Sequence, residues 1–340
     1  MAVVNVDPML LSLREPELAN ALRELDDGAT CLRFAGQWRG VANGAAPVAA
    51  LRAVPALTLA VGDPPPELDR GFDLVATASE ADEVVRAFAR APLAAVSAAL
   101  LLRDPPSDTI AALVAESTTY SMLQAGPEFR EWRAAHAPQP AGDDAVSRVR
   151  IRREGAVTEI VLTRAARHNA VDLAMRDHLH AALVEAGGGE GPILVRGDGP
   201  SFCSGGDLDE FGTFPDPVAA HVIRLQRSLA AAFDTLARRL VVAIHGACLG
   251  AGIELPAFAR CVIAADDAHI GLPEQGIGLL PGAGGTVSMT RRAGSRRVLS
   301  LLLRDATITA EEARSWGLVD EVVPVDRLRA RAVEVAESLG

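Results

Sequence analysis

The second half of the chain alternates between short apolar runs and segments with helical spacing. Apolar runs typical of buried strands occupy residues 192–196, 240–244 and 261–265. Apolar residues three and four apart predict helices at 172–185, 217–237, 253–259, 296–303 and 309–316. Residues 149–153 and 157–162 show the period of two expected for a hairpin. Strands that alternate with helices predict an α/β fold with mainly parallel pairing.

The first half carries a weaker version of this pattern. Helical spacing covers residues 8–26 and 80–90, and strand-like runs fall at 31–34, 54–61 and 72–77. Helical spacing returns at 92–102, 107–123 and 127–135, and the first two of these segments carry apolar groups on both faces. We expect such helices to bury against another element or subunit.

Composition suggests where the domains divide. Residues 134–144 are rich in alanine, proline and polar groups, as linkers are. We therefore predict a degenerate α/β region at 1–90, a helical segment at 91–136, a linker at 137–145 and the main α/β domain at 146–340.

Charge and composition narrow the function classes. The net charge of −11 argues against a nucleic-acid surface, and no apolar run approaches the ~20 residues of a membrane-spanning helix. No signal peptide is visible at the N-terminus, so we expect a cytoplasmic protein. All 33 basic residues are arginine, which excludes Schiff-base chemistry by a lysine. The four cysteines form no CxxC pair, so we expect no metal site.

A glycine pair follows the apolar run at 192–196. In Phe202-Cys-Ser-Gly-Gly-Asp207, Gly205 and Gly206 permit a tight turn close to a ligand. We expect Asp207 to cap the next helix and the amide of Ser204 to point into a cleft. A turn with a helix cap and no ligand is the alternative interpretation.

A second glycine turn follows the run at 240–244. In Leu249-Gly-Ala-Gly-Ile-Glu254, the amide of Ala251 falls at a predicted helix N-terminus, which favours negative charge. Two such amides, on Ser204 and Ala251, can form an oxyanion hole for a thioester enolate. Glu254 lies one turn further along among apolar neighbours, where burial raises a carboxyl pKa into the range of an acid/base. The alternative is that Glu254 has no catalytic role and is simply a glutamate at a helix N-terminus, where the helix dipole stabilises its negative charge.

A second glutamate, Glu274, lies in an apolar, glycine-rich loop. Two carboxylates beside one carbonyl can hold a water: one takes its proton while the other protonates carbon, which hydrates a conjugated double bond. The glycine run at 282–285 lacks the Lys-Ser/Thr ending of a nucleotide-binding loop.

These stretches together identify a resemblance. Residues 146 to about 335 resemble the enoyl-CoA hydratase/isomerase (crotonase) superfamily through segments in matching order: 167–170, 202–207, 242–254, 270–274, 278–285 and 309–320. The resemblance implies a spiral of ββα units, an acyl-CoA ligand, no metal or redox cofactor, and a homo-oligomer that is a trimer or a dimer of trimers.

The resemblance also assigns residues. It places the acid/base pair at Glu254 and Glu274 and the oxyanion amides at Ser204 and Ala251. Segment 166–170 would line the path of coenzyme A, and Arg164 or Arg167 would meet a phosphate where the family often has lysine. The residues expected to bind coenzyme A or substrate are Arg164, Ala166, Arg167, His168, Ala170, Gly205, Gly206, Asp207 and Gly250.

The order of the parts departs from the family. The family continues with a helical C-terminal subdomain that packs over the site, whereas residues 91–136 carry that pattern before the core. One hypothesis is a fused duplication, in which 1–90 is an eroded crotonase-like half and 91–136 its retained cap. In that case 55–61 and 72–76 would echo 241–244 and 261–264. The other hypothesis is an unrelated N-terminal addition.

We predict an enoyl-CoA hydratase that uses both glutamates. One alternative is a double-bond isomerase that uses a single glutamate, and another is a non-catalytic acyl-CoA-binding or assembly subunit.

Overall fold

The fold was determined as a computed structural model that describes residues 2–26, 28, 30–138, 147–214, 216–304 and 306–339. Most of the predicted linker at 137–145 lies outside these residues.

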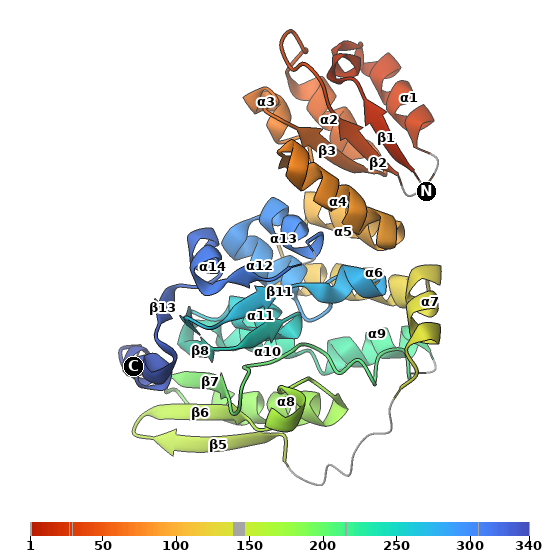
Figure 1. The fold of residues 1–340 in the computed structure, drawn as a ribbon. Coiled ribbons are helices and arrows are strands. Elements are labelled where there is room, and N and C mark those ends of the chain that lie inside the picture. The colour runs from red at the N-terminus through yellow and green to blue at the C-terminus, as the bar shows by residue number, and fades with distance from the viewer. Residues whose placement is uncertain are drawn as a thin grey trace.

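The N-terminal region is built on a parallel four-stranded sheet, shown in red and orange in Figure 1. Its strands pair in chain order: β1 (Val3–Val6), β2 (Cys31–Phe34), β3 (Leu57–Val61) and β4 (Leu74–Ala76). The helical elements of this region are η1 (Pro8–Ser12), α1 (Glu15–Leu25), α2 (Ala45–Ala53), α3 (Pro66–Asp69) and α4 (Ala78–Arg90). Sequence patterning located the other strands and α1 but missed β1 and α2, which are short and largely alanine and valine.

Three further helices connect this sheet to the second half of the chain. They are α5 (Pro92–Arg103), α6 (Thr109–Gln124) and α7 (Pro127–Ala135), close to the predicted ranges. Arg103, at the end of α5, is buried and bonds Asp73 beside β4 at 2.7 Å. It also donates to the carbonyls of Arg52 and Val54, so α5 is fixed to the N-terminal sheet.

The second half is organised around a six-stranded sheet in the order β13-β10-β8-β7-β6-β5. All its pairs are parallel except the β5–β6 hairpin. Its strands are β5 (Val149–Glu154), β6 (Val157–Leu162), β7 (Ile193–Gly197), β8 (Leu240–Ile244), β10 (Cys261–Ala265) and β13 (Glu321–Val323).

A smaller sheet gives the second half its spiral form. It contains β9 (Ala247–Leu249), β11 (His269–Gly271) and β12 (Ile308–Thr309). After β8 and β10 the chain turns immediately into β9 and β11, and after β7 it makes a bridge at Cys203 with Cys248 of β9. Successive turns of the spiral therefore place equivalent segments side by side, and the predicted ligand-binding glycines follow them.

The helical elements of the second half surround these sheets. They are η2 (Ala165–Arg167), α8 (Leu173–Gly187), α9 (Pro217–Gln226), α10 (Leu229–Leu236), η3 (Ala237–Arg239), α11 (Ala251–Glu254), η4 (Pro256–Phe258), η5 (Pro273–Ile277), α12 (Gly285–Ala293), α13 (Ser295–Leu302), α14 (Ala310–Trp316), η6 (Val325–Arg327) and α15 (Leu328–Glu337).

Two expectations about these helices were wrong. The single helix predicted over 217–237 is broken, because the side chain of Ser228 accepts from the amide of Ala231 and starts α10 afresh. The helix predicted to follow Asp207 is absent: residues 208–212 form turns, and the next helix begins at Pro217.

One apolar core joins both halves of the chain. It includes Leu57 and Leu59 of β3, much of α4 to α6, and Leu240, Val242 and Ile244 of β8. The alternate residues of β8 face the opposite side of the large sheet, where α15 covers them. Since the halves share a core, the site described next is built by both.

No single helix among the described residues is long and apolar enough to cross a membrane. Helices α4 and α5 satisfy that test only as a pair, and they are bent by 114° at their junction.

Candidate active site

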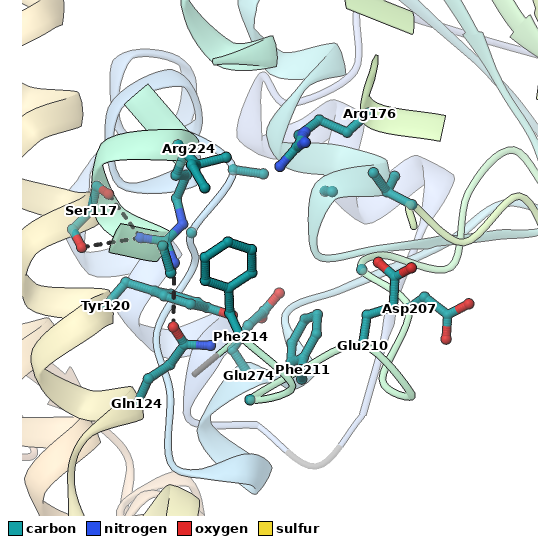
Figure 2. Close-up of a pocket in the computed structure, with 18 of the residues that line it drawn as sticks. Ser117, Tyr120, Gln124, Arg176, Asp207, Glu210, Phe211, Phe214, Arg224 and Glu274 are labelled. Carbon is teal, nitrogen blue, oxygen red and sulfur yellow. Dashed lines mark hydrogen bonds between the residues drawn. The ribbon is translucent and has the colours of Figure 1, made fainter. Parts of the chain in front are cut away.

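A cavity of about 840 Å³ lies between helices α6 and α7 and the second half of the chain (Figure 2). Residues of α6 and α7, which precede the large sheet, form one wall. The rest of the lining comes mainly from α9, the 206–214 segment, α11 and the 282–284 loop. The cavity is within the size range of small-molecule sites, and the helical segment 91–136 contributes directly to it.

The glycine turn predicted at 249–254 makes a sharp bend at Gly250. This residue has φ 50° and ψ −120°, a conformation that side-chain-bearing residues avoid. The bend starts α11, and the amide of Ala251 has no hydrogen-bond acceptor among the described residues. Ala251 lines the cavity, so this amide is available to a ligand.

The glycine turn predicted at 202–207 runs beside the turn at Gly250. A Cβ on Gly205 would lie 3.0 Å from the carbonyl oxygen of Leu249, so only glycine allows this approach. The prediction that Ser204 supplies the second free amide was wrong, because its N–H donates to the carbonyl of His168 at 3.0 Å. Gly206 lies two residues later and lines the cavity. Its amide N–H has no hydrogen-bond acceptor in the described part of the chain.

Glu254 lies one helical turn beyond Ala251 and is 1% exposed. Its Oε2 accepts hydrogen bonds from the amides of Ala283 (2.7 Å) and Gly285 (2.8 Å). Burial raises the pKa of Glu254 well above its usual value, and the charges of Glu274 and Glu116 raise it further, against these two hydrogen bonds.

Glu274 reaches the same point from η5. A Cβ on Gly250 would lie 2.3 Å from Oε1 of Glu274 and 3.7 Å from Oε1 of Glu254, so both carboxylates converge on this glycine. Oε2 of Glu274 is buried without a hydrogen-bond partner among the described residues. Burial raises the pKa of Glu274 to about 7. Both glutamates line the cavity.

A third buried glutamate, Glu116 of α6, escaped the sequence analysis. Its carboxylate accepts from the amides of Gly284 (2.7 Å) and Thr286 (3.0 Å) and from the Thr286 hydroxyl (2.6 Å). Glu254 and Glu116 thus accept from alternate amides at the start of α12. Burial raises the pKa of Glu116 to about 7. A glutamate on an otherwise apolar helix face, one turn from Leu113 and Tyr120, was the available signal.

The segment predicted to meet coenzyme A lies outside this cavity. Arg164, Ala166, Arg167, His168 and Ala170 do not line it, nor do Gly205 and Gly250. The 164–168 segment follows the end of β6. Within it, Ala166, Arg167 and His168 are exposed.

The structure gives Arg164 another role than phosphate binding. Its guanidinium is buried and forms ion pairs with Asp207 at 2.6 Å and Asp172 at 3.3 Å. Arg167 is half-exposed and also pairs with Asp207 and Asp209. Asp207 is therefore the centre of an arginine cluster that fixes the start of the 207–214 segment.

The described residues contain no group of three or more histidine, cysteine, aspartate or glutamate side chains placed to hold a metal ion. Cys203 and Cys248 are buried where the spiral segments pair, as expected of small packing residues, and burial raises the pKa of both thiols.

Comparison with known proteins identifies relatives of the second half of the chain. Residues 152–340 match the family model described as enoyl-CoA hydratase/isomerase. An enoyl-CoA hydratase/isomerase structure from Mycobacterium abscessus is 34% identical with a TM-score of 0.52, over 56% of this chain and 76% of that one. An enoyl-CoA hydratase structure from Thermoplasma volcanium is 31% identical with a TM-score of 0.52, over 57% and 77%. One from Bacillus anthracis is 30% identical with a TM-score of 0.52, over 56% and 76%. The matched region is the spiral that carries Gly206, Ala251, Glu254 and Glu274.

Proposed function

Because the chain belongs to the enoyl-CoA hydratase/isomerase family, we propose that it adds water to a 2-enoyl-CoA, or removes it from a 3-hydroxyacyl-CoA. One observation carries this proposal: two buried carboxylates converge on Gly250, next to two amides that lack an acceptor among the described residues.

The amides of Gly206 and Ala251 receive the thioester carbonyl oxygen. Charge develops on this oxygen as the enolate forms, and a fixed N–H donor removed from such a site typically costs about 3 kcal/mol of transition-state stabilisation. Gly206 replaces Ser204 in the scheme derived from the sequence.

The two glutamates act as the general base and the general acid. One of Glu254 and Glu274 takes a proton from water as its oxygen adds to C3, and the other gives its proton to C2. Their raised pKa values allow the pair to hold a single proton near neutral pH, which this division of roles requires. The substrate is a coenzyme A thioester, and the acid, base and oxyanion donors are groups of the chain itself.

Double-bond isomerisation is the second candidate. It uses the same enolate but needs one carboxylate to move a proton between C2 and C4. The buried Oε2 of Glu274, which has no partner among the described residues, favours hydration, because it is a free acceptor beside the pair where water can bind.

Single substitutions of the pair separate the candidates. Glu254→Gln and Glu274→Gln should each lower kcat/KM for hydration of a 2-enoyl-CoA by at least 10²-fold, measured by loss of the conjugated thioester absorbance. If 3-enoyl-CoA isomerisation survives in one variant at the wild-type rate, the isomerase is supported. If the wild type turns over neither substrate but binds acyl-CoA, the protein is a binding subunit.

The homo-oligomer and the cytoplasmic location remain predictions from the sequence. Sedimentation of the purified chain tests the first.

A further inference from the structure

Arg224 of α9 faces the cavity with an unusual set of partners (Figure 2). Its Nη1 donates to the hydroxyls of Ser117 (2.8 Å) and Ser121 (3.1 Å), and its Nη2 donates to Oε1 of Gln124 at 3.3 Å. The guanidinium also lies over the ring of Tyr120, 4.5 Å from its centroid. All four partners belong to α6, and none of them carries a negative charge.

No carboxylate forms an ion pair with Arg224 in the part of the chain that the structure describes. Glu116, whose charge acts on Arg224, already uses both oxygens for Gly284 and Thr286. Burial lowers the pKa of Arg224, which reflects the loss of water around its charge. Because a cation withdrawn from water without a counter-charge costs free energy, an anion at this position would be stabilised.

Of the other arginines that line the cavity, Arg130 and Arg133 donate to backbone carbonyls and the remaining two lie beside a carboxylate. Arg176 donates to Asp177 at 2.8 Å, and Arg227, the C-cap residue that follows α9, lies 3.4 Å from the same carboxylate. Arg224 still has its Nε–H without an acceptor among the described residues. It is therefore the arginine of α9 that can offer a charge to a ligand.

The position of Arg224 indicates which part of a ligand it meets. In Figure 2, Arg224 and Asp207 lie on opposite sides of Glu274. The free amide of Gly206 adjoins Asp207, so the thioester lies on that side of the glutamates. A group bound by Arg224 belongs to the acyl end, next to Tyr120 and Phe214.

We propose that Arg224 binds a carboxylate at the far end of the acyl group, and that the preferred substrates are coenzyme A thioesters of dicarboxylic acids. This inference rests on the proposed acyl-CoA site and names its substrate class. Arginine suits the role because its planar fork of N–H donors matches a carboxylate. The serines and Gln124 hold the guanidinium in place before the ligand arrives.

Binding of unreactive ligands tests the proposal without requiring turnover. Saturated acyl-CoA thioesters that end in a carboxylate are compared with thioesters of equal chain length that end in a methyl group, over four to eight carbons, by isothermal titration calorimetry. We expect the carboxylate-ended ligand to bind at least tenfold more tightly at one of these lengths. Equal affinity, or a preference for the methyl end at every length, overturns the proposal.

Variants assign the preference to the residue. Arg224→Leu should remove the preference, Arg224→Lys should keep part of it, and Arg227→Leu, the control at the C-cap of α9, should keep all of it. An unchanged preference in Arg224→Leu contradicts the proposal. If Arg224→Leu does not fold, Arg224→Lys and the wild-type comparison still decide the result.

Free coenzyme A and methyl-ended thioesters separate this role from phosphate binding. If Arg224 binds a coenzyme A phosphate, Arg224→Leu weakens all ligands equally, and the proposal fails. If no 2-enoyl-CoA is hydrated but the carboxylate preference is present, the proposed reaction fails while the substrate class stands.

Discussion

At the scale of single residues, Gly250 determines how closely the two glutamates approach the thioester site. Its φ of 50° is in the left-handed region, and a Cβ would lie 2.3 Å from Oε1 of Glu274. Gly250→Ala should therefore lower kcat/KM for hydration by about 10²-fold, because a displacement near 1 Å at a catalytic group has this effect. The free energy of unfolding should fall by about 1–3 kcal/mol.

Gly276 offers a matched control in the loop that carries Glu274. It is exposed, and a Cβ there meets no atom within 4 Å. Gly276→Ala should change the free energy of unfolding by less than about 0.5 kcal/mol and leave kcat/KM unchanged. Equal losses in both variants would show that backbone freedom in general, and not contact with the glutamates, is responsible.

The pH dependence of activity follows from the raised pKa values of the pair. Burial raises the pKa of Glu274 to about 7 and raises that of Glu254 well above its usual value. Below pH 7 both carboxyls are protonated and no base remains, whereas at high pH both are ionised and no acid remains. We expect a bell-shaped profile of kcat/KM with its acid limb near pH 7. An acid limb between pH 4 and 5 would contradict the burial argument.

The same shifts affect stability with a defined sign. A carboxyl whose pKa is raised on folding favours the protonated folded state. Its contribution is complete below the unfolded pKa, about 4.5, and is lost as the pH rises through 7. The free energy of unfolding measured with urea should therefore increase in Glu274→Gln relative to wild type at pH 8 more than at pH 5.

Sequence alone located the two glutamates and Ala251 because glycine turns and carboxylates stand directly after apolar strands. It misplaced the second amide, since the orientation of the Ser204 peptide depends on the carbonyl of His168, which comes from another turn of the spiral. Local spacing holds no information about that partner.

At the scale of elements, the start of α12 joins the cap to the site. Its first amides are divided between Glu254 and Glu116, and each carboxylate accepts from two of them. Glu116→Ala leaves two buried amides and a hydroxyl unpaired, so the free energy of unfolding should fall by about 2–4 kcal/mol.

The charge of Glu116 should affect the pH profile of activity, which a purely structural role would leave unchanged. Its charge raises the pKa of both Glu254 and Glu274, so Glu116→Gln should shift the acid limb of the pH profile to lower pH. Glu128 of α7 is the control: it accepts from the amides of Leu93 and Ala94 at the start of α5, and its charge is not among those that shift the pKa of Glu254 or Glu274. Glu128→Gln should leave the limb in place.

Helix periodicity identified most elements. It failed where an individual side chain, and not the apolar pattern, determines where an element begins or ends. The break between α9 and α10 depends on the hydroxyl of Ser228, and β3 begins only after Pro55, which has no N–H to donate. Helix α15 follows β13 and η6 and was not predicted, because its alanines give only a weak apolar pattern.

At the scale of the whole molecule, the shared apolar core predicts that the two halves unfold together. Arg103 tests this, since its buried guanidinium joins α5 to Asp73 beside β4 and to the carbonyls of Arg52 and Val54 at the end of α2. Arg103→Met leaves Asp73 as an unpaired buried charge and should cost about 3 kcal/mol. Far-UV circular dichroism and a cavity-bound acyl-CoA signal should then report one transition at a lower urea concentration.

The exposed pair of Arg153 and Glu185 provides the comparison. Both side chains are mostly exposed, 70% and 59%, so Arg153→Met should cost less than about 1 kcal/mol. Two separate transitions in Arg103→Met would mean that the halves are independent, contrary to the shared core.

The helical pattern at 91–136 suggested a cap, yet its place over the site could only come from the three-dimensional arrangement. Whether residues 1–90 are an eroded second copy stays a hypothesis. Strands β3 and β4 are adjacent and parallel, as β8 and β10 are, but they are joined by α3 without a strand like β9.

Because the cap precedes the catalytic spiral, the ribosome makes one wall of the cavity long before the other. Glu116 emerges 168 residues ahead of Gly284, which at about 5–20 residues per second is a delay on the order of ten seconds. During that time α6 presents its apolar side, its buried glutamate and the partners of Arg224 to the surroundings. The order of synthesis therefore leaves the buried side of α6 without its packing partner until the 282–286 segment has been made.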